Sequence, residues 1–234
     1  MNYSHRFAAG ALPNGQLQNG HLPKGSLPNG KIVCVGLNYA AHVAEMGSQP
    51  AAEPVLFIKP GTALRPFAGE IAIPVDRGEC HFETEVALLI GAPLRDCDVA
   101  EAQAAIAGVG LALDLTLRDL QKKLKQAGHP WERAKGFDGA CPVSEFLSPA
   151  QVGDLQNLEF RLHQNGVPRQ HGRTATMLTP VLELLCYMSR WFTLEPGDIV
   201  LTGTPEGVGP LAPGDRLVAE LGTRLRVEAG VSAR

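Results

Sequence analysis

The chain lacks any apolar stretch that could cross a lipid bilayer, because its longest apolar runs, such as Val86 to Ile90, cover only a few residues. It also lacks a basic stripe, and its formal net charge of −3 is spread over the 234 residues without long runs. This distribution argues against nucleic acid as the main partner. The N-terminus lacks the charged-then-apolar order of a secretory signal. We therefore expect a cytoplasmic protein that binds neither membrane nor nucleic acid.

Cysteine is scarce and is not arranged as a metal-binding or redox motif. The cysteines are odd in number, and no two of them form a Cys-x-x-Cys pair. This pattern fits reduced cytosolic thiols better than a disulfide framework or a zinc site. The five positions are Cys34, Cys80, Cys97, Cys141 and Cys186.

Residues 11–30 carry a five-residue repeat in which glycine recurs at positions 15, 20, 25 and 30. The repeated Pro-Asn-Gly favours turns, because proline presets φ and both Asn and Gly tolerate positive φ. A partner-binding arm is one interpretation, but the composition favours an expanded, turn-rich leader. We expect this leader at 1–30. A hydrophobic content of 44% is that of an ordinary soluble protein, and the length of the chain is as consistent with one domain as with two.

Short strands recur along the rest of the chain and are interrupted by few helices. Strands are expected at 31–35, 55–58, 70–73, 83–90, 108–115, 158–163, 169–171, 198–202, 216–221 and 224–228. Helices are expected at 38–46, 98–106, 116–128 and 179–191. Asp98 is the predicted N-cap of the second helix, Thr116 with Asp119 opens the third, and Thr179-Pro180 opens the fourth. The pattern predicts a mostly β, α+β fold without regular βαβ alternation.

Two carboxylates one residue apart, Glu83 and Glu85, lie in one of these strands, and a third follows at Asp114. Because side chains alternate along a strand, the two glutamates emerge on one face, roughly 7 Å apart. Asp114 lies in an apolar run, where an unpaired carboxylate would be costly. One hard divalent cation bound by all three carboxylates would remove both the repulsion and this cost. The alternative is a solvated strand face, with Asp114 marking a turn.

Two further pairs of polar residues have helical spacing. His42 and Glu45 are three residues apart on the first expected helix, so the carboxylate could orient the imidazole and raise its basicity. A surface contact between His42 and Glu45 is the alternative. Arg118 and Gln121 have the same spacing on a later helix, just after Asp114.

Lys135 lies between aromatic and small residues, where its charge could stabilise a developing oxyanion, although most lysines are only solvated. The glycine-rich segment 203–209 matches neither the dinucleotide-binding motif nor the P-loop, and Pro210 stands where a helix would have to begin. The sequence therefore supports no nucleotide site. The hydroxyl groups of Thr202 and Thr204 could still bind a carboxylate.

Six short motifs, taken in order, resemble the fumarylacetoacetate hydrolase superfamily and, within it, the short acylpyruvate hydrolases. They are Val35-Gly36-Leu37-Asn38-Tyr39, Phe57-Ile58-Lys59-Pro60, Glu83-Thr84-Glu85, Ala112-Leu113-Asp114-Leu115-Thr116-Leu117-Arg118-Asp119, Ala134-Lys135-Gly136-Phe137-Asp138 and Leu201-Thr202-Gly203-Thr204-Pro205-Glu206-Gly207-Val208-Gly209. The resemblance covers about residues 31–226 and is specific because the motifs occur in family order. It implies the rolled, mixed β-sheet fold of the family's C-terminal domain with a few short helices, a single catalytic domain at 31–234, and a homodimer.

The resemblance also implies a metal site. Glu83, Glu85 and Asp114 would hold one Mg²⁺ or Mn²⁺ per chain, with water and substrate oxygens completing the coordination. Close relatives often have two histidines directly before the first glutamate, whereas this chain has His81-Phe82. The three metal-binding positions are intact, so the departure affects the surroundings of the metal and the substrate preference.

Catalytic and substrate-binding roles follow from the same resemblance. His42 and Glu45 would lie on a lid helix that closes over the substrate and positions the attacking water, and Lys135 would be the active-site lysine. The positions expected to contact the carboxylate and carbonyl groups of the substrate are Arg118, Gln121 and Thr204.

The activity that this resemblance implies is that of a hydrolase acting on carbon–carbon bonds in ketonic substances. It would cleave 2,4-dioxo acids such as fumarylpyruvate or acetylpyruvate, as in aromatic catabolism, to pyruvate and a carboxylic acid. The same enolate-stabilising site would also suit oxaloacetate decarboxylation or tautomerisation, or a ring-cleavage-pathway isomerase or hydratase. A non-catalytic cation-binding module is a further alternative, but it leaves His42, Glu45 and Lys135 together without a role.

Overall fold

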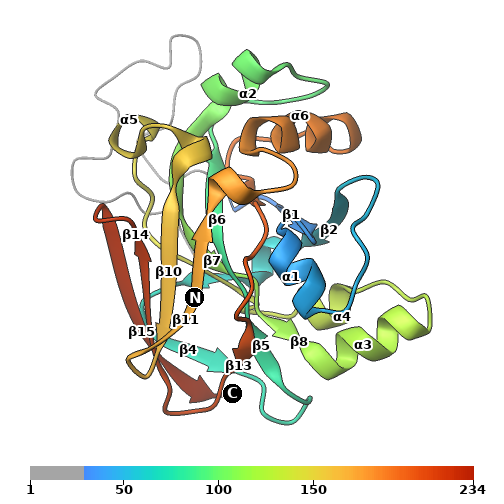
Figure 1. Ribbon diagram of the computed structural model, residues 1–234, viewed down its shortest axis with the longest axis vertical. Coiled ribbons are helices and arrows are strands. Elements are labelled where there is room, and N and C mark those ends of the chain that lie inside the picture. Colours follow the sequence, from blue (N-terminus) through green and yellow to red (C-terminus); the bar gives the residue numbers. More distant parts are fainter. Residues whose placement is uncertain (1–28) are drawn as a thin grey trace.

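The largest sheet has the strand that carries Glu85 at its centre. The structure, a computed structural model, describes residues 29–234, so nearly all of the expected leader lies outside the described residues (Figure 1). The seven strands, in spatial order, are β2 (Val55–Lys59), β1 (Ile32–Gly36), β12 (Ile199–Leu201), β6 (Thr84–Ile90), β7 (Ile106–Leu113), β9 (Cys141–Val143) and β3 (Leu64–Pro66). Every residue of β6 is buried, as expected for a continuous apolar strand that is covered on both faces.

Two smaller sheets complete the β structure. The five-stranded sheet has the order β11 (Val167–Arg173), β10 (Glu159–Gln164), β14 (Arg216–Leu221), β15 (Leu225–Ala233) and β4 (Gly69–Ile73). The three-stranded sheet has the order β13 (Gly209–Pro210), β5 (Cys80–Phe82) and β8 (Thr116–Leu117). Parallel pairs (β1–β12, β15–β4 and β3–β9) occur beside antiparallel ones, so the sheets are mixed. The predicted mostly β fold with a rolled mixed sheet is confirmed.

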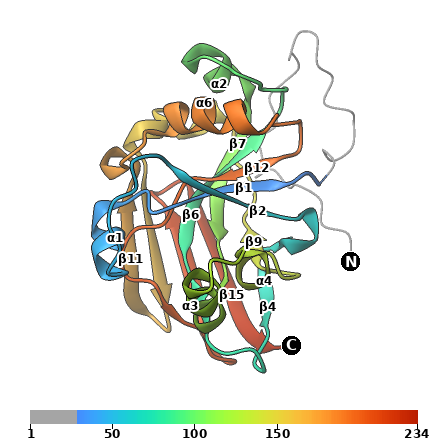
Figure 2. The ribbon, with the colours of Figure 1, turned by 90° about the vertical axis from the view of Figure 1, so that its right-hand side faces the viewer.

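The helices are short and lie around the sheets. They are α1 (Ala40–Glu45), α2 (Val99–Ala105), α3 (Arg118–Gln126), α4 (Glu132–Lys135), α5 (Pro149–Val152) and α6 (Val181–Trp191), with 3₁₀ turns at Gly61–Ala63, Leu155–Asn157 and Thr174–Thr176. Figures 1 and 2 place α2 and α6 together at one end, whereas α3 and α4 lie together on the side away from the five-stranded sheet. Within residues 29–234, no helix is long and apolar enough to cross a membrane.

Local capping explains where two of the helices begin. The Asp98 side chain accepts a hydrogen bond from Glu101 N at 2.9 Å, and the Glu101 side chain accepts one from Asp98 N at 3.0 Å. This capping box confirms the predicted start of α2. The predicted start of α6 is one residue early, because Pro180 is the N-cap and the helix begins at Val181. The backbone N–H of Thr179 instead donates a hydrogen bond to the side chain of Asn38 at 2.8 Å.

The predicted start of the third helix at Thr116 is wrong. Thr116 belongs to β8, its hydroxyl donates to the Asp114 carbonyl at 3.1 Å, and the helix begins at Arg118. Asp119 does not form a capping box with Thr116, and its carboxylate accepts a hydrogen bond from Glu79 N at 3.4 Å. Pairing with β5 is a long-range contact, so it overrides a local preference for a helix N-cap.

Candidate metal centre

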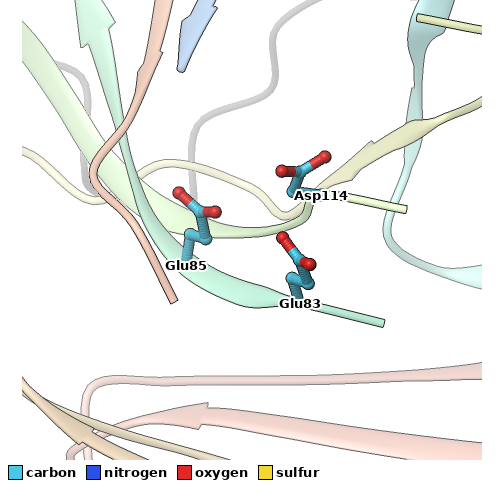
Figure 3. A group of neighbouring side chains, drawn as sticks. All are labelled: Glu83, Glu85 and Asp114. Atoms are coloured by element: carbon cyan, nitrogen blue, oxygen red, sulfur yellow. The ribbon is translucent and has the colours of Figure 1, made fainter. Parts of the chain in front are cut away.

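Three carboxylates meet where β6 and β7 pair beside the three-stranded sheet. Glu83 directly precedes β6, Glu85 lies within it, and Asp114 directly follows β7. The backbone N–H of Asp114 donates to the Glu83 carbonyl at 2.8 Å and so continues the antiparallel ladder in which Glu85 faces Ala112. Figure 3 shows the three side chains converging. One carboxylate oxygen from each residue lies within 4.8 Å of the other two, and all three residues are buried.

Two basic side chains neutralise part of this charge. Lys135, the last residue of α4, donates hydrogen bonds to Glu83 Oε2 at 2.8 Å and to Asp114 Oδ2 at 2.6 Å. Its ammonium group also lies 5.0 Å from the centre of the Phe57 ring, a distance suited to a cation–π contact. Arg118 forms an ion pair with Glu83 Oε1. Sequence reasoning singled out both basic residues, and the structure brings both to the carboxylates.

Lys59 is a third cation at the site, and sequence reasoning assigned it no role. Its side chain has no exposed surface, and Nζ lies 2.7 Å from Asp114 Oδ1 in an ion pair. The ammonium group also donates to the carbonyls of Leu115 at 3.2 Å, Ala140 at 3.1 Å and Lys135. Lys59 therefore joins the segments that carry Asp114 and Lys135. A lysine that ends an apolar strand before a proline is the only local signal.

The protonation of the carboxylates is set by these neighbours. Burial acts to raise the pKa of Glu83, but the charges of Lys135 and Arg118 outweigh it and lower that pKa well below its usual range. Burial and the charges of Asp114 and Glu83 raise the pKa of Glu85, against a hydrogen bond from Gly203 N at 2.5 Å. The pKa of Lys135 is raised, because the attraction of Asp114 and Glu83 outweighs the effect of its burial.

The donor set fits a hard divalent cation. Carboxylate oxygens are the ligands that Mg²⁺, Mn²⁺ and Ca²⁺ prefer, and three of them converge in a buried position. Within the described part of the chain, Glu83 and Asp114 have ion-pair partners, whereas none is found for Glu85. Glu85 is therefore the one carboxyl group of the three without a cationic partner among residues 29–234, and the three residues could hold one divalent cation.

Helix α1 places His42 and Glu45 next to this site. His42 Nδ1 lies 3.0 Å from Glu45 Oε2, and the residue is 5% exposed. The charge of His42 also acts to lower the pKa of Glu83, which puts the ring within electrostatic reach of the carboxylates. Glu45 Oε1 accepts a hydrogen bond from Gly207 N at 2.9 Å. The predicted pair forms, and it ties the helix to the glycine-rich segment 203–209.

Asn38 holds the residues that lead into α1. Its side-chain oxygen accepts from Thr179 N at 2.8 Å, and its Nδ2 donates to the carbonyls of Thr202 at 2.9 Å and Thr179 at 3.1 Å. A Cβ on Gly203 would lie 2.7 Å from the Asn38 Cβ, and Gly203 has φ +98°. A glycine is therefore required at the residue whose N–H binds Glu85.

The residues expected to contact substrate have partners within the protein. Arg118 Nη1 donates to Gln121 Oε1 at 2.8 Å, so this pair forms one unit on α3. The Thr204 hydroxyl donates to the Thr84 carbonyl at 2.9 Å and accepts from Gln170 Nε2 at 2.8 Å. The described contacts of Thr204 thus link it to β6, the strand of Glu85, and to β11.

Gln170, on β11, is a second residue that sequence reasoning missed. It is 2% exposed; its Oε1 accepts from Thr84 N at 2.9 Å, and its Nε2 donates to Thr204 Oγ1 and to the Pro205 carbonyl at 2.9 Å. The side chain of Gln170 therefore connects the five-stranded sheet to β6 and to the glycine-rich segment 203–209. No local pattern distinguishes this glutamine from other polar strand residues.

Tyr39, the N-cap residue of α1, brings a buried hydroxyl close to the site. The residue is 3% exposed, and its hydroxyl has no hydrogen-bond partner within residues 29–234. Burial and the charges of Glu85 and Glu206 raise the pKa of Tyr39, so the phenol stays protonated. The residue also lines a cavity of about 360 Å³ between α1, β11 and the 203–209 segment.

Comparison with known proteins confirms the resemblance that the motifs predict. The family described as fumarylacetoacetate (FAA) hydrolase C-terminal matches residues 31–231. An oxaloacetate tautomerase of Escherichia coli (strain K12) is 56% identical over 188 residues, which cover 80% of this chain and 86% of the relative. A mitochondrial oxaloacetate tautomerase of Bos taurus is 44% identical over 188 residues, which cover 80% and 85%.

A solved structure is similar over nearly the whole chain. The crystal structure of fumarylpyruvate hydrolase from Pseudomonas aeruginosa, in complex with Mn²⁺ and pyruvate, superposes with a TM-score of 0.85 at 35% identity. The match covers 92% of this chain and 94% of that chain.

Proposed function

Because the chain belongs to the fumarylacetoacetate hydrolase C-terminal family, a family of enzymes, we propose that it is a divalent-cation-dependent oxaloacetate tautomerase. The observation that carries the proposal is the buried group of three carboxylates beside Lys135 and the His42–Glu45 pair, because this arrangement suits enolate chemistry. The relative at 56% identity supports oxaloacetate as the substrate. Sequence reasoning ranked acylpyruvate hydrolysis first and this reaction second, and the curated relatives favour the reverse order.

The three carboxylates would hold Mg²⁺ or Mn²⁺, one per chain. A cation bound there supplies positive charge that makes a 2-oxo acid more acidic at the carbon beside its oxo group. The side chains then have to move one proton between that carbon and the oxygen of the enol. Tautomerisation breaks no carbon–carbon bond and consumes no water.

His42 is the residue suited to move the proton. With Nδ1–H donating to Glu45, the imidazole would keep Nε2 free to accept a proton from carbon and to return it to oxygen. Glu45 is itself fixed by Gly207 N, so the ring orientation is set by two successive hydrogen bonds. We assign His42 as the acid–base residue and Glu45 as the residue that positions it.

Lys135 and the Arg118–Gln121 pair would stabilise the negative charges of the substrate. Lys135 places its charge against the metal-binding carboxylates, where it can also stabilise an enolate oxygen. Arg118 and Gln121 act as one hydrogen-bonded unit at the edge of the same group and suit a substrate carboxylate. The described contacts of Thr204 are with other residues of the protein. Thr204 would therefore act on the substrate indirectly, by fixing the position of the 203–209 segment.

Acylpyruvate hydrolysis is the second candidate, and the Pseudomonas aeruginosa fumarylpyruvate hydrolase with Mn²⁺ and pyruvate is the observation that favours it. The same residues would serve, but His42 would have to deprotonate a water molecule. Oxaloacetate decarboxylation, in which the keto form loses CO₂ and leaves the enolate of pyruvate, is the third outcome to be tested.

One enzyme preparation, supplied with Mg²⁺ or Mn²⁺, distinguishes the three reactions. Enol-to-keto conversion is followed by the ultraviolet absorbance of the enol, decarboxylation by pyruvate release from oxaloacetate, and hydrolysis by pyruvate release from acetylpyruvate and fumarylpyruvate. We expect the first reaction to exceed the other two in kcat/KM. His42→Ala should abolish it, whereas His129→Ala, at an exposed histidine, should leave it unchanged. Pyruvate release from acylpyruvates as the fastest reaction would reject the tautomerase assignment.

The domain organisation and the oligomeric state are part of the same proposal. We propose that residues 31–234 act as a single catalytic domain and that the protein is a homodimer, as its family resemblance implies. Light scattering on the purified chain measures the mass in solution, and a monomer across the working concentration range would reject the dimer.

A further inference from the structure

Two of the cysteines differ from the rest because they meet near the surface between α2 and α6. Cys97 directly precedes the N-cap of α2, and Cys186 lies on α6. The two residues line the same surface cavity, and the Cys97 thiol is near enough to Cys186 to raise its pKa. Each residue is 8% exposed, whereas the other three cysteines are between 0% and 2% exposed and lie in the core. This contact is specific to the folded chain, because 88 residues separate the two cysteines in the sequence.

Ser189 fixes the two cysteines relative to each other. It lies one helical turn after Cys186; its hydroxyl oxygen accepts from Cys97 N at 3.1 Å and lies 3.3 Å from Cys97 Sγ. The same oxygen is 2.9 Å from the Cys186 carbonyl. Asp96, in a left-handed conformation with φ 48°, donates its N–H to the Ser189 carbonyl at 3.2 Å. The backbone of Cys97 is thus anchored to the turn of α6 that carries Cys186, which keeps the two residues side by side.

A surface cavity gives reagents access to the pair. Its volume is about 530 Å³, and both cysteines line it together with the exposed residues Asp98, Glu183 and Arg190. Burial, together with the neighbouring Cys97 thiol, raises the pKa of Cys186 to about 11. Cys186 therefore remains a thiol at neutral pH, and only a small thiolate fraction reacts at any moment. The arrangement suits a slow, site-selective oxidation.

We propose that Cys97 and Cys186 form a dithiol that oxidises to one intramolecular disulfide in the folded protein. The two S–H bonds break and one S–S bond forms, while two electrons and two protons pass to the oxidant. Hydrogen peroxide is thereby reduced to two molecules of water, and an azo compound such as diamide is reduced to its hydrazine. The bond would link the loop before α2 to α6, and a thiol reductant reverses the reaction. This inference does not depend on the reaction that the enzyme catalyses.

The test uses the full chain, treated with diamide or hydrogen peroxide under native conditions and then alkylated and digested without reduction. Mass spectrometry should find a Cys97–Cys186 cross-linked peptide that has lost two hydrogen atoms and disappears after treatment with dithiothreitol. The core thiols of Cys34, Cys80 and Cys141 serve as internal controls, because they should be alkylated only after unfolding. The oxidised protein should unfold at a higher temperature than the reduced protein.

Cys97→Ser and Cys186→Ala are the matched variants, and each should abolish both the cross-link and the oxidant-dependent rise in unfolding temperature. The proposal is rejected if the two cysteines are oxidised singly to sulfinic acids without a cross-link. It is also rejected if the cross-link forms equally well in urea, because the folded contact would then have no part in it. A lower unfolding temperature after oxidation would equally contradict a geometry that is ready for the bond.

Discussion

Replacing Lys59 by methionine tests whether the buried lysine holds the candidate site together. Methionine keeps most of the side-chain volume but removes the charge and all of its hydrogen bonds. In the folded protein the ammonium group contacts Asp114 Oδ1 and three backbone carbonyls, and its side chain has no exposed surface. The substitution would therefore leave a buried carboxylate without one of its partners and three carbonyls without this donor.

The expected loss follows from the cost of breaking a buried ion pair. Removing one partner of such a pair typically costs about 3–5 kcal/mol. Asp114 keeps its contact with Lys135, so we expect Lys59→Met to lower the free energy of unfolding by an amount within this range rather than above it. For a chain of this length, about 3–5 kcal/mol corresponds to a fall in unfolding temperature of roughly 6–20 °C.

Urea and thermal unfolding, followed by circular dichroism, measure this loss. A chelator is included, so that a bound cation does not add to the stability of either protein. Lys122→Met, at an exposed lysine on α3, is the matched control and should change the free energy of unfolding by at most about 0.5 kcal/mol. A Lys59→Met protein within about 1 kcal/mol of the wild type would refute the reasoning, because Asp114 and the carbonyls would then be satisfied without the lysine.

Three further predictions concern single side chains. Tyr39→Phe should change the free energy of urea unfolding by less than about 1 kcal/mol, because the hydroxyl lacks a partner in residues 29–234; a larger loss would show a hydrogen bond that this account omits. Gln170→Leu should cost about 2–4 kcal/mol in the same assay, because the Thr84 N–H and Thr204 hydroxyl lose their buried partner, and an unchanged midpoint would contradict that role. Burial acts to raise the pKa of Asp215, but one backbone and two side-chain amide donors lower it overall. Its contribution to stability should therefore be present above the unfolded-state pKa of about 3.9 and disappear as the pH falls through the lower folded-state pKa. Thermal melts of wild type and Asp215→Asn should differ at neutral pH and converge in acid, and a constant difference would contradict the shift.

Local sequence signals predicted the parts of the fold that depend on neighbouring residues. The Asp98 N-cap and the apolar run of β6 need no distant partner, and both occur as predicted. Thr116 also looked like a helix N-cap, but its segment pairs with β5 and extends a sheet instead. The Thr116 error shows where a long-range strand contact overrides a local preference.

In the candidate site, too, some residues could be predicted from the local sequence and others could not. Glu83 and Glu85 could be identified because strand alternation puts them on one face, and the β6–β7 pairing adds Asp114. Lys59 and Gln170 could not, because their importance comes from burial and from partners on distant segments of the chain. Neither residue is unusual in its local sequence. Local sequence patterns also could not distinguish hydrolysis from tautomerisation, since both reactions use the same enolate-stabilising groups.

The most direct test of the central claim is the rate of oxaloacetate tautomerisation with and without divalent cation, for wild type and Glu85→Gln. Glutamine keeps the shape of Glu85 but removes the one charge of the three for which no ion pair is found within residues 29–234. We expect a chelator to abolish the wild-type rate, Mn²⁺ or Mg²⁺ to restore it, and Glu85→Gln to stay inactive at the same cation concentration. A wild-type enzyme that is free of metal by elemental analysis and still converts the enol at its full rate would contradict the account.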